Sequence, residues 1–250
     1  MQKRVIAVIQ ARTNSERLPR KVLMPLGGRP VIDHVIIAVK GATLIDSVVL
    51  ATTVQACDDE LAAAGERMGV RVFRGSENDV LGRFVEALEC DNADVVIRIT
   101  ADNPLLDPLV IDRVVQEFLR GGCDYASNNL ERSWPRGMDT EVFTRHALDR
   151  AHREGLLPEH REHVTIYMRT NPDTFRLRNV SAPVDETCPE LRLSLDTKED
   201  YVLLQKVFDA LWTPGGTVSA KSVVAWLKAH PEVAALNAGV MQKKVFGRLF

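Results

Sequence analysis

The sequence predicts an α/β protein with a mostly parallel sheet and helices on both faces of that sheet. Apolar, β-prone runs alternate with helical patterns four times in the first hundred residues. The first run, residues 5–9, contains no polar residue, which is typical of a strand buried on both faces. Strands that alternate with helices in this way favour a parallel sheet whose connections are right-handed crossovers.

Short β-prone runs predict the strands in order along the chain. The first run is continuously apolar, whereas the last two alternate apolar and polar residues, as half-exposed strands do. The expected strands are residues 5–9, 47–53, 70–73 and 94–100, one that begins at 124, one that ends the segment 133–143, and the runs 175–180 and 191–195.

Helical periodicity, caps and breakers predict the helices. Pro30 is well placed to start the first helix, and Ser76 is a natural N-cap with Asp79 three residues on. Thr197 and Asp200 have the same spacing, which approximates a capping box. The expected helices are residues 30–41, 58–68, 77–89, 108–120, 145–153, 159–171, 198–211 and 220–228.

Composition places the chain among ordinary globular proteins. Its 250 residues are 45% hydrophobic and 26% charged, which suits a single domain over residues 1–250. Within it, the irregular segment 121–190 is expected to form an acceptor or lid subregion or a dimerisation arm. A net charge of -2 argues against general nucleic-acid binding. No apolar run approaches the roughly 18 residues that span a bilayer, and no C-x-x-C pair occurs. We therefore expect a cytoplasmic protein with free thiols and with neither a membrane nor a nucleic-acid partner.

Positive charge is concentrated in the loop that follows the first strand. The loop has one acid between residues 11 and 21, and its cations are Arg12, Arg17, Arg20 and Lys21. Ligands of open α/β sheets bind beyond the carboxyl ends of the strands, and arginine and lysine together can bind different oxygens of one polyphosphate. Most charge runs are only solvated surface, but the position of this one favours a phosphate site. Neither G-x-x-x-x-G-K-[ST] nor G-x-G-x-x-G occurs, which excludes a P-loop and a dinucleotide fingerprint.

Two aspartates follow predicted strands elsewhere in the chain. Asp102 emerges from the strand 94–100 shortly before a proline, and a carboxylate at that place can hold a metal. Asp196 comes directly after the run 191–195. Both therefore lie at strand ends, where the site of a parallel sheet is expected.

Other acidic residues and histidines are more ambiguous. Asp139 and Glu141 lie among turn residues, which indicates a substrate loop, although both could equally be structural carboxylates of a turn and a strand edge. His160 and His163 hint at zinc, but H-R-E-H is not H-E-x-x-H and the sequence offers no evident third ligand.

Six motifs occur in a fixed order along the chain. The loop Q-A-R-T-N-S-E-R-L-P-R-K is similar to A-R-x-x-S-x-R-L-P-x-K, and the others are F-R-G-S-E-N-D-V-L-G-R-F, R-I-T-A-D-N-P-L-L-D-P, G-M-D-T-E-V-F, E-H-V-T and L-D-T-K-E-D. The first is shared with many nucleotidyltransferases, but all six, over residues 4–240, resemble the cytidylyltransferases that make CMP-sugars. The resemblance is to the SpsF-like branch, named for spore-coat polysaccharide synthesis. It implies a Rossmann-like fold of the nucleotide-diphospho-sugar transferase type.

This resemblance implies transfer of CMP from CTP to a sugar acid, or to a related phosphorylated or phosphonate acceptor, with release of pyrophosphate. The product would serve surface polysaccharide or glycoconjugate biosynthesis, and a homodimer is one expected form. Arg12, Lys21 and Asp102 would be catalytic, and Asp102 and Asp196 would hold a Mg²⁺ cofactor, which favours carboxylate and phosphate oxygens. The expected nucleotide-binding residues are Gln10, Ala11, Arg12, Lys21, Ser76 and Arg83, and the expected acceptor-binding residues are Asp139, Glu141, Glu162 and His163.

Two other classes of protein stay open at this point. A nucleotide-sugar-dependent glycosyltransferase of the same architecture would also need a metal carboxylate beyond a buried strand, but the chain lacks an obvious D-x-D. A non-catalytic nucleotide-binding module would bind CTP without turning it over. Asn103 departs from the family pattern, in which many relatives have cysteine at this place.

Overall fold

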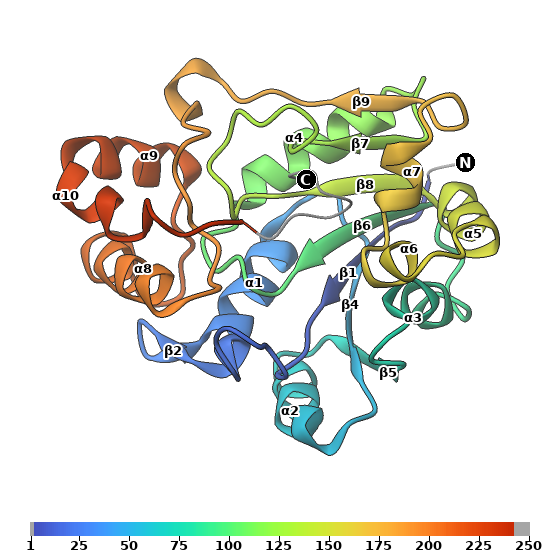
Figure 1. Cartoon of the computed structure of the whole chain (residues 1–250), viewed down its shortest axis with the longest axis horizontal. Coiled ribbons are helices and arrows are strands. Elements are labelled where there is room, and N and C mark those ends of the chain that lie inside the picture. The colour runs from blue at the N-terminus through green and yellow to red at the C-terminus, as the bar shows by residue number, and fades with distance from the viewer. Residues whose placement is uncertain (1–2, 243–250) are drawn as a thin grey trace.

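A central sheet organises residues 3–242, the part of the chain that the computed structural model describes (Figure 1). Its strands are β1 Val5–Gln10, β4 Ser47–Thr53, β5 Arg71–Gly75, β6 Val95–Thr100, β7 Tyr125–Ser127, β8 Glu141–Thr144 and β9 Leu177–Asn179. Within the described residues the sheet has seven strands in the order β5-β4-β1-β6-β8-β7-β9, and its first four are parallel. The predicted α/β fold with a mostly parallel sheet, of the nucleotide-diphospho-sugar transferase type, is confirmed.

Helices cover both faces of the sheet (Figure 1). The longer ones are α1 Val31–Gly41, α2 Asp59–Arg67, α3 Val80–Ala87, α4 Pro108–Leu119, α5 Arg145–Glu154, α8 Lys198–Leu211 and α9 Ala220–Ala229. The shorter ones are α6 Pro158–Glu162, α7 Ile166–Thr170 and α10 Pro231–Ala234. None of the helices in the described residues is long and apolar enough to cross a membrane.

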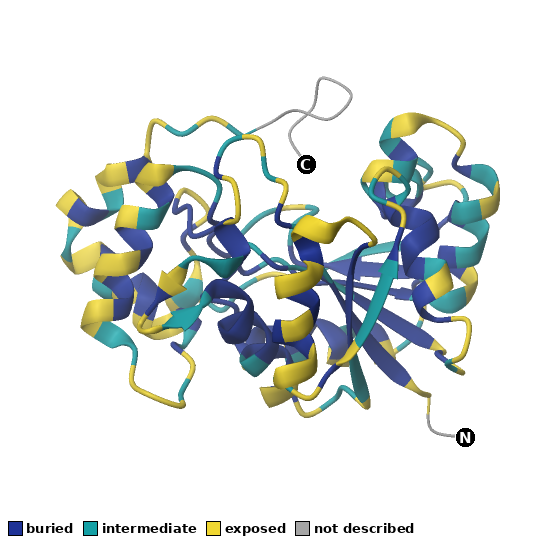
Figure 2. Ribbon diagram, turned by 90° about the horizontal axis from the view of Figure 1, so that it is seen from below, coloured by how far each residue is buried: buried dark blue, intermediate teal, exposed yellow. Residues whose placement is uncertain are grey.

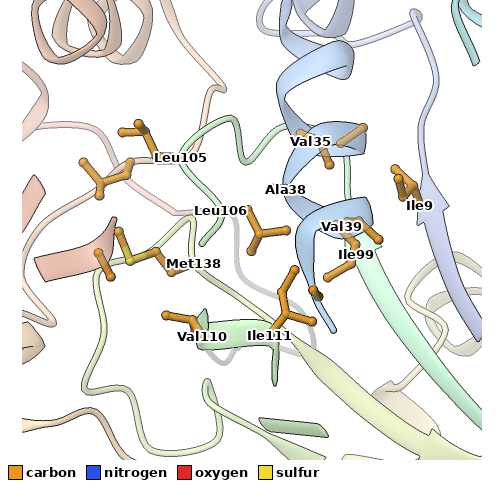
Figure 3. Close-up of a cluster of buried hydrophobic side chains, with 14 of the residues drawn as sticks. Ile9, Val35, Ala38, Val39, Ile99, Leu105, Leu106, Val110, Ile111 and Met138 are labelled. Atoms are coloured by element: carbon orange, nitrogen blue, oxygen red, sulfur yellow. The ribbon is translucent and has the colours of Figure 1, made fainter. Parts of the chain in front are cut away.

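The continuous apolar run of β1 is explained by a hydrophobic core on each side of the sheet. Val5, Ala7 and Ile9 belong to the core that includes α1, α4, α8 and α9. Ile6 and Val8 belong to the core that includes α3 and α5. Successive side chains of a strand point to opposite faces, so every residue of β1 from Val5 to Ile9 is buried. Figure 2 shows the buried strands between helices whose outer faces are exposed, and Figure 3 shows Ile9 beside α1 in the first core.

The sheet becomes mixed beyond β6, because β8 runs antiparallel to both of its neighbours, β6 and β7. This ladder places Arg98 of β6 directly opposite Glu141, the first residue of β8. A β-prone run predicts that a strand exists but carries no information on its direction. The antiparallel strand is therefore a feature that the sequence pattern could not supply.

The helix predicted over residues 159–171 is wrong as a single element. It consists of α6 and α7, which are separated at His163, a residue with non-helical backbone angles of φ -111° and ψ 48°. The chain turns inward here, because Val164 and Thr165 are 0% and 1% exposed. Burial of this turn overrides the local helical preference.

The strand predicted at residues 191–195 is also wrong. Only one bridge, between Arg136 and Arg192, pairs this segment with another part of the described chain. Its leucines are buried, and so is Ser194, which an exposed alternating strand would present to solvent. The alternating pattern reflects burial from both sides rather than a half-exposed strand.

The predicted caps have two outcomes. Ser76 is not the N-cap of α3, because Asp79 has that position and accepts a hydrogen bond from Gly82 N at 2.8 Å. Ser76 instead accepts from Asp79 N at 3.1 Å, one turn before the helix. Thr197 and Asp200 form the predicted capping box at the start of α8.

Candidate active site

A buried carboxylate beside α2 anchors the basic loop that follows β1. Thr13 donates to Asp58 Oδ1 from both its backbone nitrogen and its hydroxyl, each at 2.7 Å. Thr53, the last residue of β4, donates to the other oxygen of this carboxylate. Burial raises the pKa of Asp58, but these hydrogen bonds outweigh burial and bring the pKa below its usual value. The charged anchor therefore holds the loop at the carboxyl ends of β1 and β4.

Lys21 lies between two carboxylates from distant parts of the chain. Its Nζ is 2.7 Å from Asp102 Oδ2 and 2.7 Å from Asp196 Oδ1. Asp102 reaches the loop because β6, which precedes it, is the direct neighbour of β1 in the sheet. Burial lowers the pKa of Lys21, but attraction to the two carboxylates raises it above its ordinary value. Lys21 is therefore charged at neutral pH.

Asp196 is surrounded by further cations. Its Oδ2 lies 3.0 Å from Arg17 Nη2 and accepts a hydrogen bond from Arg192. Asp200, 0% exposed, accepts from Arg192 Nε and from Asp196 N, both at 2.9 Å. Burial raises the pKa of Asp196, but Lys21, Arg17 and Arg192 outweigh it and the net shift is downward. Asp196 is thus held both ionised and oriented.

A cavity of about 300 Å³ lies against the basic loop, and Arg12, Arg17 and Lys21 are in its wall. Arg83, which is only 1% exposed, also lines it and donates to Ser76 O at 2.6 Å. Its Nε has no hydrogen-bond partner among residues 3–242. Burial, followed by repulsion from Arg12, lowers the pKa of Arg83 to about 10. An anion bound in this cavity would stabilise the charge of Arg83, which suits a polyphosphate.

A second cavity of about 290 Å³ adjoins the first. The residues that line both are Arg17, Thr100, Asp102, His163 and Asp196. The second cavity adds three arginines, Arg98, Arg136 and Arg169. Ser194 is 7% exposed in its wall, and the Ser194 hydroxyl has no hydrogen-bond partner in the described part of the chain. These groups suit a ligand with an anionic group.

The structure brings most of the predicted site residues to these two cavities. Those in the wall of the first are Gln10, Ala11, Arg12, Lys21, Arg83, Asp102, Glu162, His163 and Asp196. Asp139 lines the second and is ion-paired with Arg132. Ser76 lines a neighbouring surface hollow, and Glu141 is 3% exposed and absent from both walls. These are positions, and the roles assigned to the residues stay predictions.

Three residues that support the site are not identified by the sequence analysis. Asp58 is the first residue of the predicted helix 58–68 and comes shortly after the predicted strand 47–53, which is a signal that could have revealed it. Arg192 is a lone cation in an apolar run, and a buried cation needs a partner. Asp200 is recognised only as a capping residue, although it also orients Asp196.

The donor set at this site suits Mg²⁺. No group of three or more His, Cys, Asp or Glu side chains among the described residues could hold a metal alone. Magnesium commonly uses only one or two carboxylates, with phosphate oxygens and water completing its shell. Asp102 and Asp196 meet this requirement because their oxygens converge on one point, Lys21 Nζ.

His160, which the sequence suggested as a zinc ligand, packs its ring edge-on against Tyr167, with centroids 5.2 Å apart, as a core histidine does.

Three comparisons with known proteins agree with this arrangement. Residues 6–215 match the family model described as cytidylyltransferase. The spore coat polysaccharide biosynthesis protein SpsF of Bacillus subtilis is 37% identical over 238 residues, which cover 92% of this chain and 96% of that protein. The structure of a cytidylyltransferase from Leptospira borgpetersenii superposes with a TM-score of 0.88 at 29% identity, covering 98% of this chain and 100% of that one.

A more distant structure supports the fold alone. CMP:2-keto-3-deoxy-manno-octonic acid synthetase complexed with CTP gives a TM-score of 0.62 at 20% identity, covering 83% of this chain and 98% of that one. The resemblance to SpsF-like cytidylyltransferases is thus confirmed by sequence and by structure, and the glycosyltransferase alternative gains no support. The protein is a CTP-dependent enzyme of the CMP-sugar synthetase type, and it belongs to the cytidylyltransferase family.

Proposed function

We propose that this enzyme transfers CMP from CTP to an acidic acceptor, namely a sugar acid or a related phosphorylated or phosphonate compound. The observation that carries the proposal is the position of Lys21, Asp102 and Asp196 where two cavities meet. Asp102 and Asp196 line both cavities. A nucleotide in the first cavity and an acceptor in the second would therefore react beside these carboxylates.

The first cavity would hold CTP. Arg12 and Lys21 of the basic loop and the buried Arg83 would bind the triphosphate, whose charge offsets theirs. Gln10 and Ala11 would lie near the cytosine. Asp102 and Asp196 would hold Mg²⁺, which neutralises phosphate charge when it is bound.

The reaction is an in-line displacement at the α-phosphorus of CTP. An acceptor oxygen forms the new P–O bond, the bond to the β-phosphate oxygen breaks, and pyrophosphate leaves with that electron pair. The acceptor hydroxyl proton passes to solvent or to a nearby base. Lys21 and Arg12 stabilise the charge that develops on the leaving pyrophosphate, because positioning and charge neutralisation dominate this chemistry.

The second cavity would hold the acceptor. The three arginines that only the second cavity contains, Arg98, Arg136 and Arg169, outnumber the one acid that it adds among the described residues, Asp139, and the Ser194 hydroxyl lies in the same wall. This set supports an acidic acceptor rather than a neutral sugar. The synthetase that shares the fold acts on a sugar acid by its name, and the name of SpsF points to polysaccharide biosynthesis.

The segment 121–190 would act as the acceptor and lid subregion of the single domain. His163 and Glu162 come from it and line the first cavity, and His163 also lines the second. A role in surface polysaccharide biosynthesis, a cytoplasmic location and a homodimer remain part of this proposal.

A screen for pyrophosphate release tests the proposal. The enzyme is given CTP, Mg²⁺ and a panel in which each sugar acid is paired with its neutral alcohol or methyl ester. We expect release with at least one acid and at least 100-fold less with its neutral partner, since a neutral group forfeits the charge-assisted hydrogen bonds that the arginines of the second cavity offer to an anion. Equal rates for an acid and its neutral partner would contradict the assigned acceptor class. A panel in which no acid supports pyrophosphate release would contradict it as well.

A further inference from the structure

Glu141, the first residue of β8, is buried where the sheet meets the turn that contains Thr165. Its Oε1 accepts hydrogen bonds from Tyr125 Oη at 2.6 Å and from Thr165 Oγ1 at 2.7 Å, and Arg98 donates to its Oε2. Arg169 adds a fourth contact at 3.9 Å. A carboxylate has about four lone-pair sites, so little capacity is left for a substrate. Glu141 is thus better suited to hold other residues than to touch the acceptor.

The residue that Glu141 holds most directly is Arg98. The two are opposite each other in the antiparallel ladder of β6 and β8, and cross-strand partners on one face are close neighbours. Arg98 lines the second cavity, whereas Glu141 does not. Arg98 Nη1 donates to Glu141, and Arg98 Nε donates to Gln10 Oε1 at 3.2 Å. Arg98 Nη2 has no hydrogen-bond partner within the described residues and is the nitrogen left for a ligand.

The same contacts join the two cavities. Gln10, the far end of this chain of bonds, lines the first cavity. Val8 is the ladder partner of Arg98, and Gln10 is two residues on, so its side chain lies on the same face of the sheet. Thr165 joins the carboxylate to the turn between α6 and α7, only two residues after His163, which lines both cavities.

We propose that Glu141 is a positioning residue that fixes Arg98, so that Arg98 Nη2 binds the anionic group of the acceptor in the second cavity. The inference rests on the proposed function only for the identity of this cavity as the acceptor site. Glu141 is thus expected to act on the acceptor through Arg98, rather than to touch the acceptor itself. This role also makes Arg98, which the sequence analysis does not single out, a determinant of acceptor binding.

The test uses inorganic sulfate as the anion, so that it needs no knowledge of the acceptor. Sulfate is titrated into the full-length enzyme by calorimetry with CTP saturating and no acceptor present, which leaves the second cavity to the anion. Arg98→Gln should weaken sulfate binding about 10-fold, the effect of one charge-assisted hydrogen bond. Glu141→Gln should weaken it by a similar factor. The double variant should bind sulfate no more weakly than Arg98→Gln alone, because both substitutions disrupt the same Arg98–Glu141 pair.

Tyr125→Phe is the matched control. It removes another hydrogen bond from the same carboxylate but leaves the bond to Arg98 intact, so it should lower the melting temperature without changing sulfate affinity. A purely electrostatic role for Glu141 predicts the opposite sign, because loss of a carboxylate beside several cations strengthens anion binding. Unchanged or tighter binding by Glu141→Gln, or no sulfate binding by the wild type, would overturn the inference. CTP binding is measured first in the same experiment. A protein that does not bind CTP would contradict the proposed function, and this result is distinct from a loss of sulfate binding.

Discussion

Lys21 and Asp102 form an ion pair at the centre of the active site, with 2.7 Å between Nζ and Oδ2. The pair connects the loop after β1 to the loop after β6, two strands that are neighbours in the sheet. Asp196 completes the cluster from the other side of Lys21. The basic loop and both expected metal ligands thus meet at one ammonium group, that of Lys21.

Lys21→Ala and Arg12→Ala should differ in their kinetic effects. Lys21 is 8% exposed between the carboxylates, so its loss should mainly lower kcat, by about 100-fold. The Arg12 side chain is 40% exposed at the edge of the cavity, so its loss should also raise the KM for CTP. Steady-state kinetics with CTP varied separates the two effects. Wild-type kinetics in both variants would place the phosphate site elsewhere.

The enzyme should prefer CTP to UTP. The two bases differ where cytosine has an amino donor and uracil a carbonyl acceptor, and a protein acceptor that faces this position pairs only with cytosine. An unsatisfied buried polar group costs about 1 to 3 kcal/mol, which corresponds to roughly 5- to 150-fold discrimination. Comparison of kcat/KM for the four nucleoside triphosphates measures it. Equal values for CTP and UTP would be incompatible with specific recognition of cytosine.

Glu141 should make the fold sensitive to acid. Burial raises its pKa, but Arg98, Arg169 and two hydroxyl donors outweigh burial and lower the pKa to about 2. A carboxyl group whose pKa is lowered on folding stabilises the fold above its unfolded pKa, and this stability is lost as the pH falls toward the folded pKa. The loss should therefore occur between about pH 4.5 and pH 2, and amount to about 3 kcal/mol.

Denaturant unfolding of the wild type and Glu141→Gln across this range measures the contribution. The wild type should be the more stable protein at pH 6, and the difference between the two should shrink as the pH is lowered. A difference that stays constant from pH 6 to pH 2.5 would show that the buried carboxylate is not the group that titrates.

The parts of the site that the sequence predicts lie at the ends of parallel strands. Lys21 and Asp102 follow β1 and β6, and parallel neighbours bring their carboxyl ends to the same edge of a sheet. Buried apolar runs identify such strands as members of a parallel sheet, so the loops that follow them can be placed at the same edge. The strand-end argument fails for Asp196, because the segment before it is not a strand of the sheet, so the motif resemblance alone identifies this residue.

The supporting contacts could not be predicted in the same way. The Arg98–Glu141 pair depends on the antiparallel direction of β8, and periodicity does not encode direction. Thr13 and Asp58 are 45 residues apart, and their contact requires knowing how the loop folds over β4. The break at His163 results from tertiary burial of the turn that follows it. Each of these features depends on which segments meet, rather than on local preference.

The most direct test of the account is Mg²⁺-dependent release of pyrophosphate from CTP by Asp102→Asn and Asp196→Asn, with the acceptor that the screen identifies. Each variant should lose at least 100-fold in rate, because an amide cannot replace a carboxylate in neutralising and holding the cation. Asp59→Asn, which changes an exposed aspartate paired with Arg74 outside both cavities, is the matched control and should keep full activity. Circular dichroism and thermal melting establish that all three variants are folded. Wild-type turnover by a correctly folded Asp102→Asn or Asp196→Asn enzyme would contradict the assignment of these carboxylates to the metal and the reaction.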